Sequence, residues 1–153
     1  MRNFYKKLGS ILYVIFLPLI RPVINHTERV SVVVIYNKKV LLVKNWLARD
    51  SWRFPGGGIK KDESYLHAAA REIKEELRIV TTENRFEILG QLTALRDGFT
   101  YPYTLLVYKI DIHPKVLHDQ YEIVAYEWFD KLPKNYDPEL EEIFDLLKKR
   151  RLI

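Results

Sequence analysis

The chain has 153 residues, a length that suits one domain of ordinary size. Its hydrophobic content of 48% is sufficient for one core, and a charged content of 29% indicates a hydrated surface. The formal charge of +5 is compatible with an anionic partner but does not distinguish a phosphorylated substrate from nucleic acid or lipid. The chain contains no cysteine, which excludes disulfides, cysteine-ligated zinc and a thiol nucleophile and favours a cytoplasmic location.

The first 25 residues form a separate apolar segment, and residues 26–153 form the main domain. Arg2, Lys6 and Lys7 precede an apolar run over residues 8–20. This outline resembles a signal peptide, but no small-residue cleavage site follows it. The run is also shorter than the roughly 20 residues that span a bilayer. We expect an extra N-terminal helix that docks on the domain or forms a homodimer, with a membrane-surface anchor and an uncleaved signal as the alternatives.

Short runs rich in β-branched residues predict strands along much of the main domain. Five are expected, over residues 30–36, 40–43, 86–95, 103–112 and 125–129. A polar turn joins the first two strands as a hairpin. A second turn, around Asp97 and Gly98, separates the third strand from the fourth.

Two segments have the spacing of amphipathic helices. In residues 64–77 the apolar stripe consists of Leu66, Ala70, Ile73 and Leu77. In the C-terminal helix, Asp137 is expected to cap the first turn and Pro138 to occupy its first position. The buried face of this helix is Leu140, Ile143, Phe144 and Leu147. Its basic end, residues 148–151, suits the negative end of the helix dipole, which we prefer to a nucleic-acid patch.

Three glutamates on the first of these helices are the main candidates for a functional site. Glu72, Glu75 and Glu76 are spaced i, i+3 and i+4 and project from one face, away from the apolar stripe. Carboxylates at this spacing repel each other unless cations neutralise them, and hard oxygen ligands suit Mg²⁺ or Mn²⁺. Arg71 can pair with Glu75 or with Glu63 and so orient a metal ligand.

A run of three glycines, residues 56–58, precedes this helix. Such a run permits a positive φ angle or a close backbone approach, so a main-chain carbonyl can complete a metal shell. A simple tight turn is the commoner reason for three glycines. The run is not a phosphate-binding P-loop, because no Gly-Lys-Ser/Thr follows.

Together, these residues resemble the Nudix box. That pattern reads Gly, five residues, Glu, seven residues, Arg-Glu, an apolar residue, any residue, Glu-Glu, any residue, Gly and an apolar residue. The matching positions are Gly57, Glu63, Arg71, Glu72, Ile73, Glu75, Glu76 and Ile79. Arg78 stands where the family usually has glycine, at a helix end where a left-handed conformation is common. A non-glycine residue there costs roughly 1 kcal/mol and removes no metal ligand.

The resemblance, which extends over about residues 28–150, implies an α/β fold: an α/β/α sandwich around a mixed central β-sheet. It implies that Glu72 and Glu76 bind the metal directly, together with Glu75 and the Gly56 carbonyl, and that Arg71 supports catalysis. The base that activates water comes, in many relatives, from a loop outside the box. Glu122 is the candidate here, an ordinary exposed glutamate is the equal alternative for it, and Asp119 and Glu127 are weaker choices.

The implied reaction is Mg²⁺-dependent hydrolysis of a phosphoanhydride bond, by attack of water on phosphorus, in a nucleoside diphosphate linked to another moiety. The partner is then a small-molecule nucleotide derivative, and no specific nucleic acid is expected. Nucleoside triphosphates, nucleotide sugars and dinucleotide polyphosphates all remain candidates. Loop-edge aromatics, among them Tyr101 and Tyr103, can stack on a base or pack on the sheet. A non-catalytic nucleotide sensor on the same fold is the alternative function.

Overall fold

A computed structural model describes residues 28–46, 50–96, 99–113 and 122–153 of the chain. The expected N-terminal helix, the turn at Asp97 and Gly98, and Asp119 lie outside these residues. Within the described ranges, no helix has both the length and the apolar character needed to cross a membrane.

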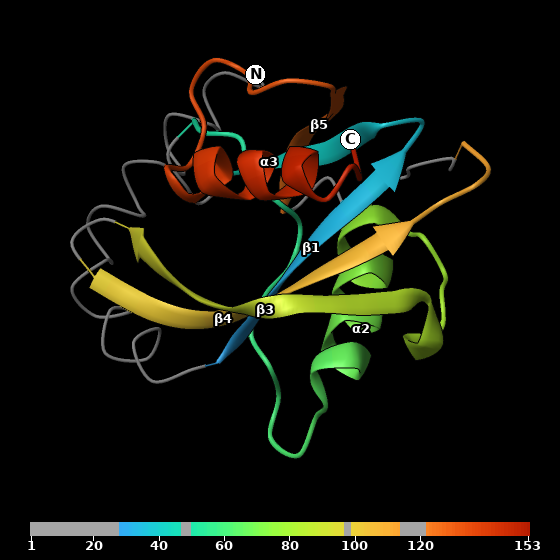
Figure 1. Cartoon of the computed structure of the whole chain (residues 1–153). Coiled ribbons are helices and arrows are strands. Elements are labelled where there is room, and N and C mark those ends of the chain that lie inside the picture. The colour runs from blue at the N-terminus through green and yellow to red at the C-terminus, as the bar shows by residue number, and fades with distance from the viewer. Residues whose placement is uncertain (1–27, 47–49, 97–98, 114–121) are drawn as a thin grey trace.

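A five-stranded mixed sheet forms the centre of the domain (Figure 1), with the strand order β3-β4-β1-β2-β5. The strands are β1 (Arg29–Tyr36), β2 (Lys39–Asn45), β3 (Phe86–Arg96), β4 (Phe99–Lys109) and β5 (Ile123–Phe129). β1 runs parallel to β4, and the other neighbouring pairs are antiparallel. The predicted hairpin between the first two strands is confirmed, with Val34 opposite Leu41.

The fourth strand was expected over residues 103–112 but runs from Phe99 to Lys109. Its early start follows from pairing with β3, which continues to Arg96 opposite Phe99. The pairing with β1 begins only at Tyr103, so Pro102 has a strand neighbour on one side alone. A proline lacks the backbone N–H and is tolerated where one side of a strand is unpaired.

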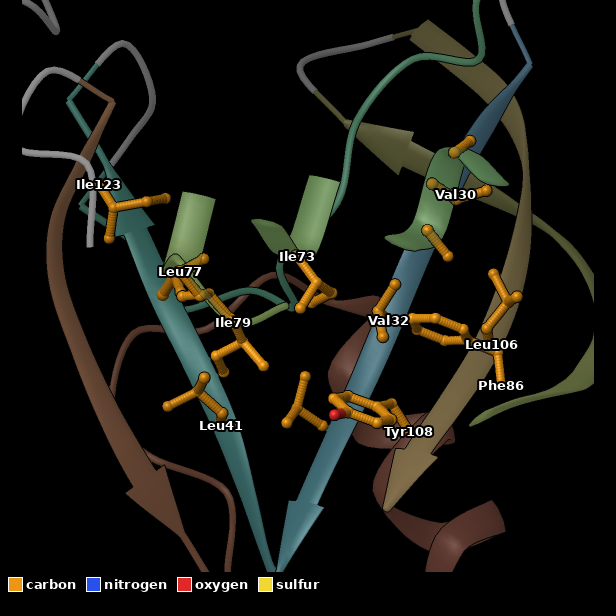
Figure 2. Packing of buried hydrophobic residues seen from close by; sticks show 14 residues of the cluster. Val30, Val32, Leu41, Ile73, Leu77, Ile79, Phe86, Leu106, Tyr108 and Ile123 are labelled. Atoms are coloured by element: carbon orange, nitrogen blue, oxygen red, sulfur yellow. The ribbon is translucent and has the colours of Figure 1, made fainter. Parts of the chain in front are cut away.

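Helix α2 (Tyr65–Leu77) covers one face of the sheet. It begins after Ser64, whose side chain accepts a hydrogen bond from the His67 backbone N–H at 3.1 Å. It ends at Arg78, which has the left-handed conformation expected there, with φ 58°. Figure 2 shows Ile73 and Leu77 of this helix beside the strands that carry Val32 and Leu41.

Helix α3 (Glu139–Lys149) packs on the opposite face, so the domain is the expected α/β/α sandwich (Figure 1). Its buried residues are those predicted, Leu140, Ile143, Phe144 and Leu147. They join a second core cluster with alternate residues of β1 and β4, such as Val33 and Leu105. A short 3₁₀ helix, η1 (Glu83–Arg85), connects α2 to β3.

The predicted cap of the C-terminal helix is wrong in one respect. The helix begins at Glu139 after Pro138, and no side chain caps it. The Asp137 side chain instead accepts a short hydrogen bond from Ser51 and lies 3.5 Å from the Arg53 Nε atom. A carboxylate that is held by these side chains is not positioned to cap the helix. Asp137 therefore connects α3 to the segment that leads into the glycine run.

Candidate active site

The site lies where β1 and β2 diverge and the segment from Arg53 to Ile59 runs between them. Val43 exchanges two backbone hydrogen bonds with Arg53, at 2.8 and 3.1 Å. On the other side, the Val30 N–H donates to the Gly57 carbonyl at 2.9 Å, and the Ile59 N–H donates to the Glu28 carbonyl at 2.9 Å. The glycine run is therefore held as an additional strand-like segment beside the start of β1.

Two of the three glycines have close neighbours, and at Gly56 the backbone of Val30 leaves no room for a side chain. Gly56 has φ 142°, and a side chain there would collide with the Val30 carbonyl oxygen. A Cβ atom at Gly57 would lie 2.5 Å from the Glu72 Oε1 atom. The run is thus more than a tight turn, because it lets the backbone approach the carboxylates of α2.

The glutamates of α2 do not form the exposed face that the sequence predicted. Glu76 is 2% exposed and Glu72 is 9% exposed, whereas Glu75 is exposed. The Gly56 N–H donates to Glu76 Oε2 at 3.0 Å. The prediction failed because the glycine segment packs over this side of the helix, a contact between residues 20 positions apart.

Arg71 joins the charged residues of the site to each other. Its guanidinium donates to both oxygens of Glu63, at 2.7 and 2.8 Å. It also donates to Glu72 at 2.7 Å, to Glu75 at 3.1 Å and to the Gly58 carbonyl at 2.8 Å. Both expected pairings, with Glu63 and with Glu75, are therefore present. The arginine fixes the position of Glu72 relative to the glycine segment.

The carboxylates differ in pKa because their surroundings differ. The hydrogen bonds from Arg71 lower the pKa of Glu63 to about 2. Burial raises the pKa of Glu72 against the opposing effect of Arg71. Burial raises the pKa of Glu76 well above its usual range, and the charges of Glu122 and Glu72 add to this effect. The two buried carboxylates therefore resist ionisation unless a cation compensates their charge.

Glu122 faces the same cavity as the glutamates of α2. The cavity has a volume of about 270 Å³, and its lining includes Gly56, Glu72, Glu75 and Glu122. The Asn45 side-chain amide donates to a Glu122 carboxylate oxygen at 3.5 Å, which directs that carboxylate toward β2. Glu76 lies beneath this surface, bonded to the Gly56 backbone. Four of the six predicted site residues thus line this cavity, Glu76 lies beneath it, and Arg71 contacts Glu72 and Glu75.

Other candidates from the sequence lie elsewhere. Glu127 is exposed on β5 opposite Leu42 and does not line the cavity. Tyr101 and Tyr103 are buried and line the cavity, so they both pack on the sheet and border the site.

Sequence reasoning missed several lining residues, above all Arg29, Asn45 and Glu139. They belong to the start of β1, the end of β2 and the start of α3. Nothing in their local sequence marks them, because each enters the site only through long-range packing.

The chemistry of these side chains fits a divalent cation. Within the described part of the chain, no three acidic or imidazole side chains converge closely enough to enclose a metal ion as they stand. Ionised carboxylates without a cation repel each other, and Arg71 holds Glu72. The oxygen atoms of Glu72, Glu75 and Glu76, with the Gly56 carbonyl, are nevertheless hard ligands of the kind that Mg²⁺ or Mn²⁺ prefers.

The family to which these features point is confirmed by comparison. The model of the NUDIX domain matches residues 25–146, which is most of the chain. The chain therefore belongs to the Nudix family.

Curated relatives match over shorter stretches. An 8-oxo-dGTP diphosphatase from Buchnera aphidicola subsp. Acyrthosiphon pisum is 39% identical over 49 residues, which cover 32% of this chain and 40% of that protein. An RNA pyrophosphohydrolase from Hahella chejuensis is 37% identical over 68 residues, covering 44% of this chain and 39% of that protein. The chain thus spans about two fifths of the length of the curated relatives it matches.

Solved structures agree on the fold. A MutT Nudix hydrolase from Burkholderia pseudomallei superimposes with a TM-score of 0.67 at 22% identity. The superposition covers 78% of this chain and 95% of that protein. The mixed sheet between two helices is therefore the Nudix fold.

Proposed function

We propose that the protein hydrolyses a phosphoanhydride bond in a nucleoside diphosphate linked to another moiety, with Mg²⁺ or Mn²⁺ as cofactor. The observation that carries this proposal is that Glu72 and Glu75 line one cavity with the glycine segment, while Glu76 lies beneath it and accepts a hydrogen bond from the Gly56 backbone. Buried carboxylates of raised pKa destabilise a fold unless a bound cation compensates them. A Nudix domain with this arrangement is better suited to metal-assisted hydrolysis than to sensing alone.

Each residue of the site has a distinct part in this proposal. Glu72 and Glu76 hold the cation with Glu75 and the Gly56 carbonyl, and Arg71 keeps Glu72 in place. A bound divalent cation neutralises phosphate charge and lowers the pKa of water. Glu122, which lines the same cavity, accepts the proton from the attacking water.

Two matched relatives are named for 8-oxo-dGTP and for RNA, and both names describe the release of a phosphate-containing product. These names support a nucleotide derivative as the substrate. They also extend the test beyond small molecules to an RNA that carries a 5′-triphosphate. The substrate panel therefore includes nucleoside triphosphates, 8-oxo-dGTP, a nucleotide sugar, a dinucleotide polyphosphate and that RNA.

The first test is release of phosphate, pyrophosphate or nucleotide from this panel with Mg²⁺, with Mn²⁺ and with EDTA. We expect turnover that requires the metal. Glu122→Gln is expected to lower kcat by about 100-fold or more, in the range of a lost general base. Glu127→Gln is the matched control, because this glutamate is exposed outside the cavity, and its kcat should equal that of wild type. Binding of nucleotides without any turnover would favour the sensor function.

The segment over residues 8–20 is proposed to contact a membrane surface or a second copy of the chain, because its apolar run follows three cationic residues. Sedimentation with anionic vesicles and light scattering separate the two. The control is the full chain carrying Ile15→Asp and Leu17→Asp. If wild type neither sediments with vesicles nor dimerises, this proposal fails.

A further inference from the structure

The cavity has a second side, whose chemistry differs from that of the carboxylates. Glu72 and Glu75 enter it from α2, on one face of the sheet. Tyr101 and Tyr103 enter it from β4, on the face that α3 covers. Arg29, at the start of β1, pairs with Tyr103 in the parallel register and with Gly58 through an isolated bridge. Its backbone therefore links the aromatic side of the cavity directly to the glycine segment.

Two arginines line the cavity, and they have different surroundings. Arg53 is held by Asp137 and Ser51. Arg29 lies over the Tyr101 ring, with its guanidinium carbon 5.6 Å from the ring centroid. In the described residues, the Arg29 guanidinium forms no ion pair or hydrogen bond. The stacking on a buried tyrosine orients this guanidinium without consuming any of its N–H groups.

An oriented guanidinium with all its donors available is suited to an oxyanion, which it binds through two parallel hydrogen bonds. The carboxylates that line the cavity are Glu72, Glu75, Glu122 and Glu139. Glu72 pairs with Arg71, and Glu122 contacts Asn45. None of the four makes an ion pair with Arg29 among the described residues. The Arg29 guanidinium is therefore available to bind an anionic group of a ligand.

We propose that Arg29, stacked on Tyr101, binds a phosphate group of the nucleotide on the side of the cavity opposite the metal-binding carboxylates. This inference rests on the proposed function, since it assigns one group of the same substrate. It favours a substrate with a phosphate group that reaches β1 and β4. This phosphate either lies outside the cleaved anhydride or stays on the nucleoside after cleavage. The role is one of binding and positioning.

The test compares nucleoside 5′-monophosphates with the corresponding nucleosides by isothermal titration calorimetry, with Mg²⁺ present. Wild type is expected to prefer the monophosphate. Arg29→Gln should weaken monophosphate binding by about 10-fold, in keeping with a lost charged hydrogen bond, and leave nucleoside binding unchanged. Arg29→Lys keeps the charge and should retain part of the preference. Arg85→Gln is the matched control, because Arg85 is half-exposed beside Asp111 and lies outside the cavity.

Three results would overturn the inference: no monophosphate preference in wild type, unchanged monophosphate binding in Arg29→Gln, or equal loss of both ligands. Equal loss would indicate base stacking or local packing in place of phosphate binding. Melting temperatures of all variants verify that they are folded. Failure of the two proposals can be told apart. If turnover is metal-dependent but Arg29→Gln binds the monophosphate as wild type does, only the role of Arg29 is refuted. If Arg29→Gln selectively loses monophosphate binding but no substrate is turned over, only the hydrolase proposal is refuted.

Discussion

The two helices cover opposite faces of one sheet, yet they bury different chemistry. The buried residues of α3 are all aliphatic or aromatic, and its one charged residue at the cavity is Glu139 in the first turn. α2 buries Ala68, Ala69, Ile73 and Leu77 together with two carboxylates, Glu72 and Glu76. Burial of apolar side chains stabilises the fold, whereas burial of carboxylates opposes it unless they are paired. The comparison indicates that α3 mainly stabilises the fold, whereas the buried carboxylates of α2 lower stability and form part of the site.

Glu76→Gln is the substitution expected to have the largest effect and tests the role of the buried carboxylates of α2. We expect turnover to fall by about 100-fold or more, because loss of even an outer partner of a metal ligand costs 10–100-fold. Without metal, the variant should be at least as stable as wild type. Burial raises the pKa of Glu76, so its ionisation destabilises the folded state as pH rises above the unfolded pKa. Turnover assays and melting curves in EDTA test both statements. A variant that is both inactive and much less stable would contradict the assignment.

The opposite result is expected in α3. Leu147 is fully buried in the second core cluster and does not line the cavity. Leu147→Ala should lower the free energy of unfolding by about 2–5 kcal/mol through lost burial and the cavity it leaves. Turnover per folded molecule should stay at the wild-type value. Urea denaturation measures the first quantity, and assays well below the midpoint measure the second. A large loss of kcat in the folded protein would show that the two faces are not independent.

A third substitution tests how much the hydrogen bonds between Glu63 and Arg71 of α2 stabilise the fold. The Glu63 carboxylate is only 6% exposed and accepts two hydrogen bonds from Arg71. Glu63→Gln should lower stability at neutral pH by about 1–3 kcal/mol, the range for hydrogen bonds to charged groups. The pKa of Glu63 is lowered to about 2, so its contribution is present above its ordinary pKa and is lost as pH falls toward 2. The difference between wild type and variant should therefore shrink between about pH 4.5 and 2. A difference that is independent of pH would refute this.

The smallest effect is expected at the end of α2. Arg78 has φ 58°, a conformation that costs a non-glycine residue roughly 1 kcal/mol. Arg78→Gly should therefore raise stability by about 1 kcal/mol, offset in part by the larger entropy of the unfolded glycine chain. The kcat value should not change, since Arg78 does not line the cavity that holds the carboxylates. Arg150→Gly serves as the control, because Arg150 has φ −83° and gains no such relief.

The sequence by itself determined the helices, the five strands and the box. Each of these depends on local periodicity or on fixed spacing, as with Ile73 and Leu77 or with Glu72 and Glu76. It also determined that Arg78 ends α2 in a left-handed conformation, because the box requires a turn at that position. The start of the fourth strand was misplaced, since Pro102 discourages a strand unless one side lacks a partner.

Only the tertiary structure decided which faces were buried and which distant residues joined the site. Glu72 and Glu76 are buried because the glycine segment inserts between β1 and β2, a packing that helix spacing does not encode. Arg29 reaches the cavity through the parallel pairing of β1 with β4, and pairs of this kind are non-local. Likewise, the Asp137 side chain does not cap α3 but pairs with Arg53, which is distant in the sequence. Local patterns fix the elements, but the contacts that complete a site form between elements and are fixed by packing.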